Sequence, residues 1–428
     1  MYSTSLWHPC SQMKDYESFT PLNIKYAKGS CLYSDNNTPI IDAISSWWCK
    51  SLGHNHPAIK AAILKQLEVM EHTILANTTN TTVDKLGQRL CHLTGLDKVL
   101  FASDGSCAVE IAMKMASHAR HLRNQAYKKK FIALKNGYHG ETCATLSISD
   151  LGLYKDAYQD LLFDCEHIPL MPYVTGRADP LWHDASEHWQ KTKKFLDARQ
   201  KSLNAIILEP ILQGAGGMRI YSQDFLKRLG NWCKENDVYL IADEIMTGIG
   251  RCGKMLASEH ARIDPDFVCL SKGLTGGVLP LSVTLTHNTL YALFYDDYES
   301  QKAFLHSHTH SGNTLASAVA LAVLDVFEQE NLLDYINQSL APKLLNNMIE
   351  VAEKTGKLHN IRAIGAVVAA DLKNPAHSRA GYQIYQKAVK LGALLRPLGN
   401  TLYWLPPLNS DSQTLDQLKT ITIKALKD

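Results

Sequence analysis

The chain has little net charge and no long apolar run. Its 44 basic and 42 acidic side chains leave a formal charge of +2. A chain so close to neutral shows no electrostatic preference for a nucleic acid or an anionic membrane surface as a partner. No apolar stretch approaches the length that a membrane-spanning helix needs. We therefore expect neither nucleic acid nor membrane among the partners of this protein.

Paired cysteines and a secretory signal pattern are also missing. The ten cysteines are scattered singly, without a C-x-x-C pair or a zinc-like spacing. The first residues, MYSTSLWHPC, show no basic segment followed by an apolar one. These features predict a reduced, cytoplasmic protein. With 428 residues, of which 45% are hydrophobic, the chain is long enough to bury a large core shared by more than one lobe.

Between about residues 95 and 275, apolar strand-like runs alternate with loops and helical segments. The runs cover residues 99–102, 131–134, 204–208, 238–242 and 267–270. This order predicts a doubly wound α/β domain. Residues 151–190 have little periodicity and predict a long excursion over the active-site face. We expect residues 51–325 to form the large domain and residues 326–428 a smaller α+β domain, against which residues 1–50 pack.

Two of these runs end in charged residues that a buried strand does not ordinarily hold. Asp243 follows residues 238–242, and Lys272 comes shortly after residues 267–270. The carboxyl ends of neighbouring parallel strands open onto one crevice. There a lysine can hold an aldehyde cofactor as a Schiff base and an aspartate can keep a pyridinium nitrogen protonated, which is pyridoxal phosphate chemistry. Taken alone, the two residues are equally compatible with a surface ion pair.

Two further segments fit the same cofactor. Gly105 and Ser106 open a strongly helical segment, where free backbone N–H groups can bind a phosphate, although simple helix capping is the commoner meaning of such a turn. Tyr138 lies between glycines after residues 131–134. It is either a plain loop residue or an aromatic ring lying flat on the cofactor.

Aromatic, histidine and arginine residues elsewhere leave alternatives open. If Trp47 and Trp48 lie on an extended segment, one points into the core and the other toward a cavity. The alternate histidines at 306, 308 and 310 have no carboxylate or cysteine beside them, so a loop is favoured over a metal site. Arg396 is either an ordinary surface residue or a binding group for a carboxylate.

Eight motifs occur in order across nearly the whole chain. They are WHPCSQM, SSWW, DGSCAVEIAMKMA, NGYHGET, ILEPILQGAGGMR, LIADEIMTGIGRCGK, LSKGLTGG and RPLGN. Together they resemble the class III aminotransferases, and WHP, SSWW and QGAGGMR resemble the members that act in biotin biosynthesis. The resemblance implies a fold type I transferase with a large doubly wound domain, a mixed and mostly parallel sheet, and a smaller α+β domain. It also implies pyridoxal 5'-phosphate as cofactor and a homodimer with the active site at its interface.

The resemblance further implies individual roles. Lys272 would carry the cofactor and shuttle a proton, Asp243 would contact the pyridine nitrogen, and Tyr138 would line the ring and the substrate pocket. The other implied cofactor contacts are Gly105, Ser106, His308 and, across the dimer interface, Thr309. The other implied substrate contacts are Trp47, Ser307, Arg396 and Tyr403.

The implied reaction moves an amino group from S-adenosylmethionine to 8-amino-7-oxononanoate, giving 7,8-diaminononanoate. Ornithine and γ-aminobutyrate aminotransferases are similar but carry a glutamate where Ala215 stands, and that glutamate can mask the arginine corresponding to Arg396. Ala215 cannot mask it, which favours substrates with a carboxylate. The alternatives are lysine as donor, another class III ω-aminotransferase, and a pyridoxal-binding protein without turnover.

The sequence departs from the family pattern in three places, one of them a pair of residues. Cys10 stands where a tyrosine that recognises substrate is usual, Ser307-His308 replace a Gly-Pro pair, and Glu141 replaces an aspartate. A thiol is smaller than a phenol and a weak hydrogen-bond donor. We therefore expect an altered substrate affinity or a substitute hydroxyl from elsewhere.

Overall fold

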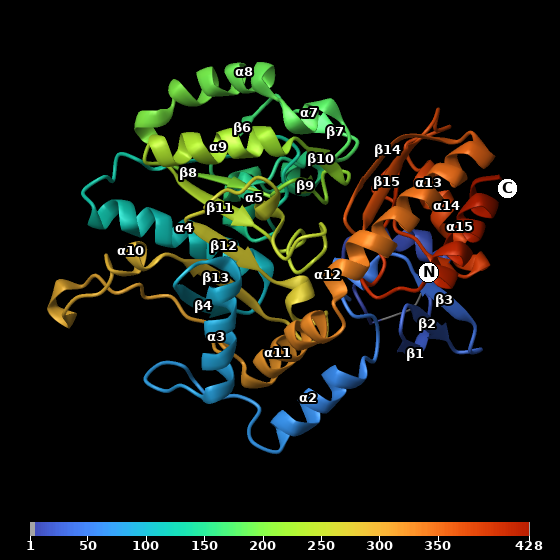
Figure 1. Ribbon diagram of the computed structural model, residues 1–428, viewed down its shortest axis with the longest axis horizontal. Helices are drawn as coiled ribbons and strands as arrows, with labels where there is room; N and C mark the ends of the chain where they lie inside the picture. The colour runs from blue at the N-terminus through green and yellow to red at the C-terminus, as the bar shows by residue number, and fades with distance from the viewer. Residues whose placement is uncertain (1–4, 428) are drawn as a thin grey trace.

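The computed structural model describes residues 5–427, with a seven-stranded sheet at the centre of its larger part (Figure 1). The strand order is β4-β13-β12-β11-β8-β5-β6. The strands are β4 (Lys98–Ala102), β5 (Lys130–Leu134), β6 (Glu166–Ile168), β8 (Leu203–Leu208), β11 (Tyr239–Asp243), β12 (Phe267–Leu270) and β13 (Ser282–Thr286). Only β13 runs antiparallel to its neighbours. The predicted mixed, mostly parallel sheet is thus confirmed.

Helices cover both faces of this sheet, which explains why its central strands are apolar throughout. α4 (Gly105–Leu122) packs on the face that carries Ala205 and Ile207 of β8. α9 (Gln223–Glu235) packs on the opposite face, which carries Ile206 and Leu208. Successive side chains of a strand point to opposite faces, so one apolar run supplies both cores.

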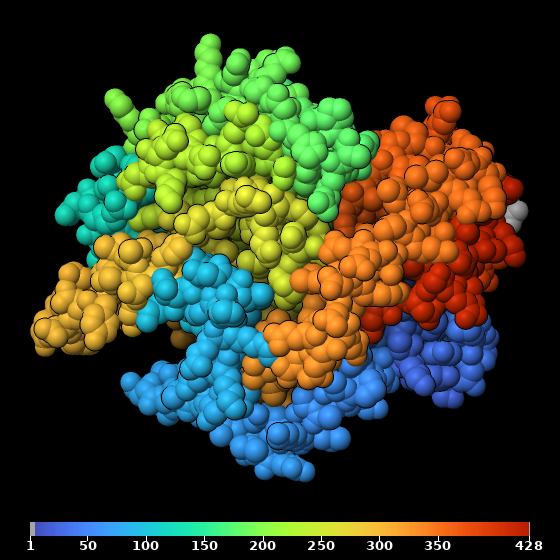
Figure 2. Space-filling view, viewed as in Figure 1, coloured from blue at the N-terminus to red at the C-terminus, as the bar shows by residue number. Residues whose placement is uncertain are grey.

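The two ends of the chain lie together in a second lobe. Its C-terminal part has an antiparallel sheet of β14 (Leu358–Ile364), β15 (Val367–Leu372) and β17 (Thr401–Trp404), with α13 (Ala341–Thr355), α14 (Ala380–Leu391) and α15 (Ser412–Lys427). The N-terminal strands β1 (Ile24–Lys28), β2 (Cys31–Ser34) and β3 (Pro39–Asp42) form a sheet with β16 (Ala393–Leu394). In Figure 2 the dark-blue and orange-to-red segments accordingly form one body on the right.

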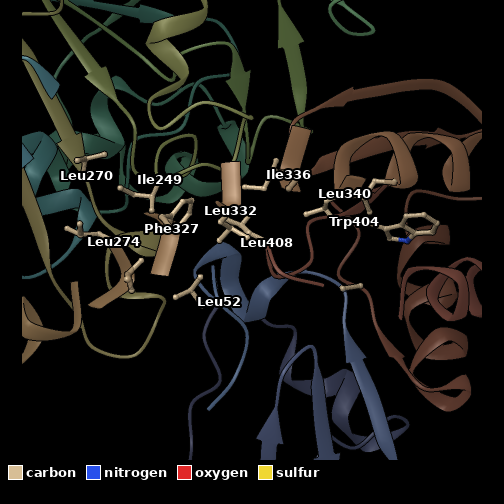
Figure 3. Packing of buried hydrophobic residues seen from close by; sticks show 14 of the residues in the cluster. Leu52, Ile249, Leu270, Leu274, Phe327, Leu332, Ile336, Leu340, Trp404 and Leu408 are labelled. Carbon is tan, nitrogen blue, oxygen red and sulfur yellow. The ribbon is translucent and has the colours of Figure 1, made fainter. Parts of the chain in front are cut away.

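A continuous apolar core joins the two lobes (Figure 3). It runs from Leu270 of β12 through Phe327 of α11 (Thr314–Gln329) to Leu408 and Trp404 of the C-terminal lobe. All four side chains are nearly inaccessible to solvent. This packing fixes the small lobe beside the carboxyl ends of the large sheet.

Residues 151–190 are more regular than predicted. They contain β6 at the edge of the large sheet, β7 (Tyr173–Val174), α7 (Pro180–His183) and the start of α8 (Ser186–Asp197). These elements are mostly too short for periodicity to show in the sequence. The prediction of one irregular excursion here is therefore wrong.

No helix within residues 5–427 has the length and apolar character to cross a membrane. All ten cysteines fall within this range, and each is a free thiol.

A charged cluster holds α4 against the segment that leads into β11. Asp237 accepts hydrogen bonds from Arg120 at 2.9 Å and from Lys128 at 3.0 Å, and both basic side chains are buried. Burial alone would raise the pKa of Asp237, but the hydrogen bonds from Lys128 and Arg120 lower it to about 2.

We expect Asp237→Asn to reduce the free energy of unfolding at pH 7 by about 2 kcal/mol, because Arg120 stays buried while its half-exposed carboxylate partner is lost. The folded-state pKa lies below the unfolded-state value. The stabilisation is therefore complete above about pH 4 and is lost as pH falls toward 2. Urea unfolding at pH 7 and pH 3.5 measures both effects. Asp416→Asn is the control, since its partners Lys343 and Lys419 are more exposed than Arg120; an equal loss in both variants would contradict the argument.

Candidate active site

A cavity of about 410 Å³ lies at the carboxyl ends of the central strands. Its lining comes from the last residue of β11, from segments that follow β4, β5, β8, β11 and β12, from the segment before β13, and from Trp48 and Cys49. Of the predicted site residues, five line it: Gly105, Ser106, Tyr138, Asp243 and Lys272. The topology therefore brings together side chains that are up to 167 positions apart in the sequence, from Gly105 to Lys272.

Asp243 is held rigidly in this cavity. Its Oδ2 accepts a hydrogen bond from Nδ1 of the buried His139 at 2.8 Å, and its Oδ1 accepts one from the backbone N–H of Ile245 at 3.2 Å. A carboxylate bound by such donors keeps a fixed orientation. The His139 side chain is not among the residues that the sequence singled out, although its position next to Tyr138 in the NGYHGET motif was a signal.

Lys272 lies in the turn that follows β12, and its backbone has a φ of 40°. A non-glycine residue rarely adopts this conformation, and such strain is concentrated at functional sites. Burial lowers the pKa of the Lys272 ammonium, while Asp243 and Glu209 act in the opposite direction. Its Nζ lies 5.5 Å from the centre of the Trp48 ring. The cavity thus holds an amine that is easier to deprotonate than an exposed lysine.

The N-terminus of α4 forms another wall. Asp104 caps the helix by accepting the N–H of Cys107 at 3.1 Å, which leaves the N–H groups of Gly105 and Ser106 without an acceptor within the helix. The chain approaches them closely at Gly140, where φ is 134° and an added Cβ would lie 2.2 Å from Ser106 Oγ. Only glycine fits there. This helix end can bind an anion beside the lysine and the aspartate.

Glu209 is a further carboxylate in the cavity to which the sequence analysis gave no role. Its Oε2 accepts the backbone N–H of Tyr138 at 3.0 Å, and its Oε1 accepts that of Gly214 at 2.9 Å. Burial raises its pKa to about 7. Its position at the end of an apolar strand is the same signal that drew attention to Asp243.

The tryptophan pair differs from the prediction. Residues 45–48 form the short α1 (Ser45–Trp48) with φ values of 60° at Ser46 and 65° at Trp48, so the segment is not extended. Trp48 is buried and lines the cavity, whereas Trp47 is exposed and does not. Trp48 Nε1 donates a hydrogen bond to the hydroxyl of Tyr403 at 2.9 Å. Tyr403 therefore reaches the cavity only through Trp48.

Arg396 is also outside the cavity lining. Its guanidinium lies 4.3 Å from the centre of the Trp47 ring, a cation–π contact that orients it. Burial raises the pKa of Tyr154, and the nearby charge of Arg396 acts in the opposite direction. The Tyr154 ring packs edge-on against Tyr138 at 6.0 Å. A positive charge thus lies beyond the tyrosines at the cavity.

Ser307, His308 and Thr309 belong to a loop and do not line the cavity. His308 Nδ1 lies 3.3 Å from Ser103 Oγ, next to the α4 N-terminus, while Ser307 and Thr309 are exposed. Within residues 5–427, no three histidine, cysteine or acidic side chains are grouped as metal ligands would be.

Cys10 and Glu141 meet at the Tyr138 side chain. The Tyr138 hydroxyl donates a hydrogen bond to Glu141 Oε1 at 2.8 Å, and the Cys10 thiol lies 3.9 Å from the same oxygen. Two residues that depart from the family pattern are therefore neighbours.

Comparisons with known proteins agree with this geometry. Residues 12–426 match the family model described as aminotransferase class-III. The adenosylmethionine-8-amino-7-oxononanoate aminotransferase of Helicobacter pylori is 43% identical over 406 residues, which cover 94% of this chain and 91% of the relative. The enzyme of the same name from Aquifex aeolicus is 35% identical, with 94% and 91% covered.

Solved structures show the same fold. The crystal structure of adenosylmethionine-8-amino-7-oxononanoate aminotransferase from Methanocaldococcus jannaschii has a TM-score of 0.91 at 32% identity, covering 99% of this chain and 97% of that one. An amine transaminase from an uncultivated Pseudomonas species, in its PLP-bound form, has a TM-score of 0.90 at 29% identity, covering 99% and 98%.

Proposed function

The chain belongs to the class III aminotransferase family, and we propose that it transfers an amino group from S-adenosylmethionine to 8-amino-7-oxononanoate, a step of biotin biosynthesis. The observation that carries this proposal is the meeting of Lys272, Asp243 and the α4 N-terminus in one cavity. The names of the relatives support the choice of both substrates.

The cofactor is pyridoxal phosphate, and the groups in the cavity fit it. The N–H groups of Gly105 and Ser106 would hold its phosphate, Asp243 its ring nitrogen, and the Lys272 amine its aldehyde carbon. Tyr138, which lines the same cavity, would lie along the ring. Bound there, pyridoxal phosphate supplies the electron sink that stabilises negative charge at the substrate carbon.

Lys272 is the group that we assign to proton transfer. Its amine must be neutral to accept a proton from the substrate carbon, and burial favours this form by lowering its pKa. Asp243 stays next to His139 throughout and fixes negative charge at the opposite end of the site.

Both proposed substrates carry a carboxylate, and we assign its binding to Arg396. The Trp47 ring positions the guanidinium, and Trp47 and Ser307 complete the proposed direct substrate contacts. The buried Tyr403 would act through its hydrogen bond with Trp48. Ala215 has no acidic group that could pair with Arg396. This argues against ornithine or γ-aminobutyrate as the donor.

A second copy of the chain would complete the site. His308 and Thr309 would contact the phosphate of the partner's cofactor, and neither lines the cavity of its own chain. The neighbouring segment carries exposed Tyr295, Tyr298 and Leu305, and in Figure 2 it projects in gold from the left of the molecule. Such apolar exposure is typical of an interaction surface. Light scattering should give the mass of a dimer, near twice 47.7 kDa; a monomer that remains fully active would contradict this assignment.

The donor is tested by following the absorption spectrum of the pyridoxal phosphate-loaded protein as single amines are added without acceptor. We expect S-adenosylmethionine to convert the cofactor to its amino form, and 8-amino-7-oxononanoate then to reverse the change. If lysine or an ω-amine converts the cofactor to its amino form and S-adenosylmethionine does not, our assignment of the donor is wrong. A protein without an absorption band for lysine-bound cofactor would be a binding protein and no transaminase.

Cys10→Tyr provides a prediction about substrate affinity. A phenol in place of the thiol adds a strong hydrogen-bond donor beside Glu141 Oε1, which the Tyr138 hydroxyl already uses. We expect KM for 8-amino-7-oxononanoate or S-adenosylmethionine to change by about threefold to tenfold, equivalent to roughly 1 kcal/mol. Steady-state kinetics with each substrate varied measures this. Cys91→Ser, on α3 (Thr81–Thr94) and away from Glu141, is the control; unchanged kinetics in Cys10→Tyr would exclude a substrate contact at this position.

A further inference from the structure

Glu209 joins two loops that lie on different sides of the cavity. It follows β8 directly, and its two carboxylate oxygens accept one backbone N–H each, from Tyr138 and from Gly214. Its own carbonyl accepts the hydroxyl of Tyr221 at 2.8 Å. The chain just after it is strained, because Ile211 is β-branched and has a φ of 67°. Two backbone N–H groups thus hold the Glu209 carboxylate, and the Tyr221 hydroxyl holds the Glu209 backbone.

Each loop is associated with an aromatic wall of the cavity. The first holds the Tyr138 ring. The second, residues 214–218, begins at Gly214, where an added Cβ would lie 3.3 Å from the Trp48 ring, and continues with Ala215. Moving either loop would therefore move an aromatic wall of the cavity. A neutral acid retains one good acceptor oxygen, whereas a carboxylate offers two.

Charged and titratable groups face Glu209 from several elements. Burial raises its pKa most strongly, His139 and the two N–H donors lower it, and Asp243 raises it, for a resulting value of about 7. Burial lowers the pKa of Lys272, and Glu209, like Asp243, acts in the opposite direction. The groups facing it are His139 on the loop after β5, Asp243 on β11, Lys272 after β12, and Tyr173 and Tyr221 on β7 and β10 (Arg219–Tyr221).

We propose that Glu209 is a positioning residue for transamination, whose carboxylate clamps the Tyr138 loop to the 214–218 loop and supplies negative charge to Lys272. This inference rests on the proposed transaminase function but not on the identity of the amino donor. As pH falls through about 7, Glu209 takes up a proton and releases one of the two N–H groups. The loss of activity on the acid side of the pH–activity profile then measures the release of the two loops by Glu209.

Glu209→Gln tests the clamp and the charge together. An amide has one acceptor oxygen, so one loop is released at every pH. We expect kcat to fall about tenfold and the acid limb near pH 7 to disappear. The second readout is the absorption band of the cofactor bound at Lys272. Its pH midpoint should move down by about one unit, because a positive charge at Lys272 loses a negative neighbour.

Glu244→Gln is the matched control. Glu244 is also a buried acid at a strand end that accepts two backbone N–H groups, those of Ala257 and Ser258, but it does not line the cavity. This variant should keep the acid limb and the band midpoint even if its thermal stability falls. Glu209→Asp separates the two effects, since it retains the charge but is too short to reach both N–H groups. We expect it to lower kcat and to leave the midpoint unchanged.

Two results would overturn the proposal. In the first, Glu209→Gln keeps the acid limb and the band midpoint of the wild type. Glu209 would then neither clamp the two loops nor supply charge to Lys272. Equal shifts in Glu209→Gln and Glu244→Gln would show a general effect of removing buried charge. The absorption readout needs no amino donor, so a wrong donor assignment would leave this test intact.

Discussion

Lys272→Ala should reduce the rate of amino transfer by about 10⁴-fold or more, the full range attributed to a positioned proton-transfer group. The substitution removes the amine that faces Asp243 and Glu209 in the cavity. Water can fill the space, but it has neither the pKa nor the fixed position of the lysine. The measurement is the rate of each half-reaction in rapid mixing, with the protein loaded with pyridoxal phosphate.

The same variant distinguishes loss of chemistry from loss of folding. Lys272 lines a cavity, so its truncation removes little core packing, and we expect the melting temperature to stay within a few degrees of the wild-type value. Lys390→Ala on the surface of α14 is the control for removing a lysine. A small amine added to Lys272→Ala should restore part of the proton transfer. Retention of more than a hundredth of the wild-type rate would contradict the assignment.

Most residues of the proposed cofactor site can be found from the sequence, because they follow apolar strands. Asp243, Lys272 and Gly105 each stand where such a run ends, and the topology of a parallel sheet brings these ends together. The signal is strong because a charge at the end of a buried strand is unusual. The same logic would have indicated Glu209, which ends β8 in the same manner.

The substrate side of the site is harder to predict, for two physical reasons. Which tryptophan lines the cavity depends on the local turn at residues 45–48, whose positive φ values no periodicity reveals. The prediction for this pair therefore had the wrong backbone conformation. Arg396 lies on the other lobe, and its distance from the cavity depends on how the two lobes pack. Contacts between lobes leave no repeating pattern in the sequence.

Short elements were missed for a related reason. β6 has three residues and β7 has two. Both are shorter than the run of alternating apolar and polar residues by which a strand is identified in a sequence. Their positions are determined by pairing with β5 and β10, since isolated segments of this length are not stable. Tertiary contacts, rather than local sequence, thus create the regular structure between residues 151 and 190.

Asp243→Asn should reduce the rate of the donor half-reaction by about 10³-fold, comparable to the loss of a key preorganised electrostatic group. The asparagine side chain has nearly the same shape, so the cavity stays intact. It carries no charge, however, and cannot hold the cofactor's ring nitrogen in its protonated form. The asparagine amide has one acceptor oxygen where the aspartate carboxylate has two. The N–H groups of His139 and Ile245 therefore compete for a single acceptor.

We expect Asp243→Asn to change the rate of the reaction much more than cofactor affinity, because the α4 N-terminus and Lys272 would still hold the other two parts of pyridoxal phosphate. Rapid mixing with S-adenosylmethionine measures the rate, and titration of the cofactor-free variant measures the affinity. Glu244→Gln is the control, since this neighbouring carboxylate accepts hydrogen bonds from Thr247, Ala257 and Ser258 and does not line the cavity. If Asp243→Asn loses less than tenfold in rate, ring-nitrogen protonation does not depend on Asp243, and the electron sink must be maintained by another group in the cavity.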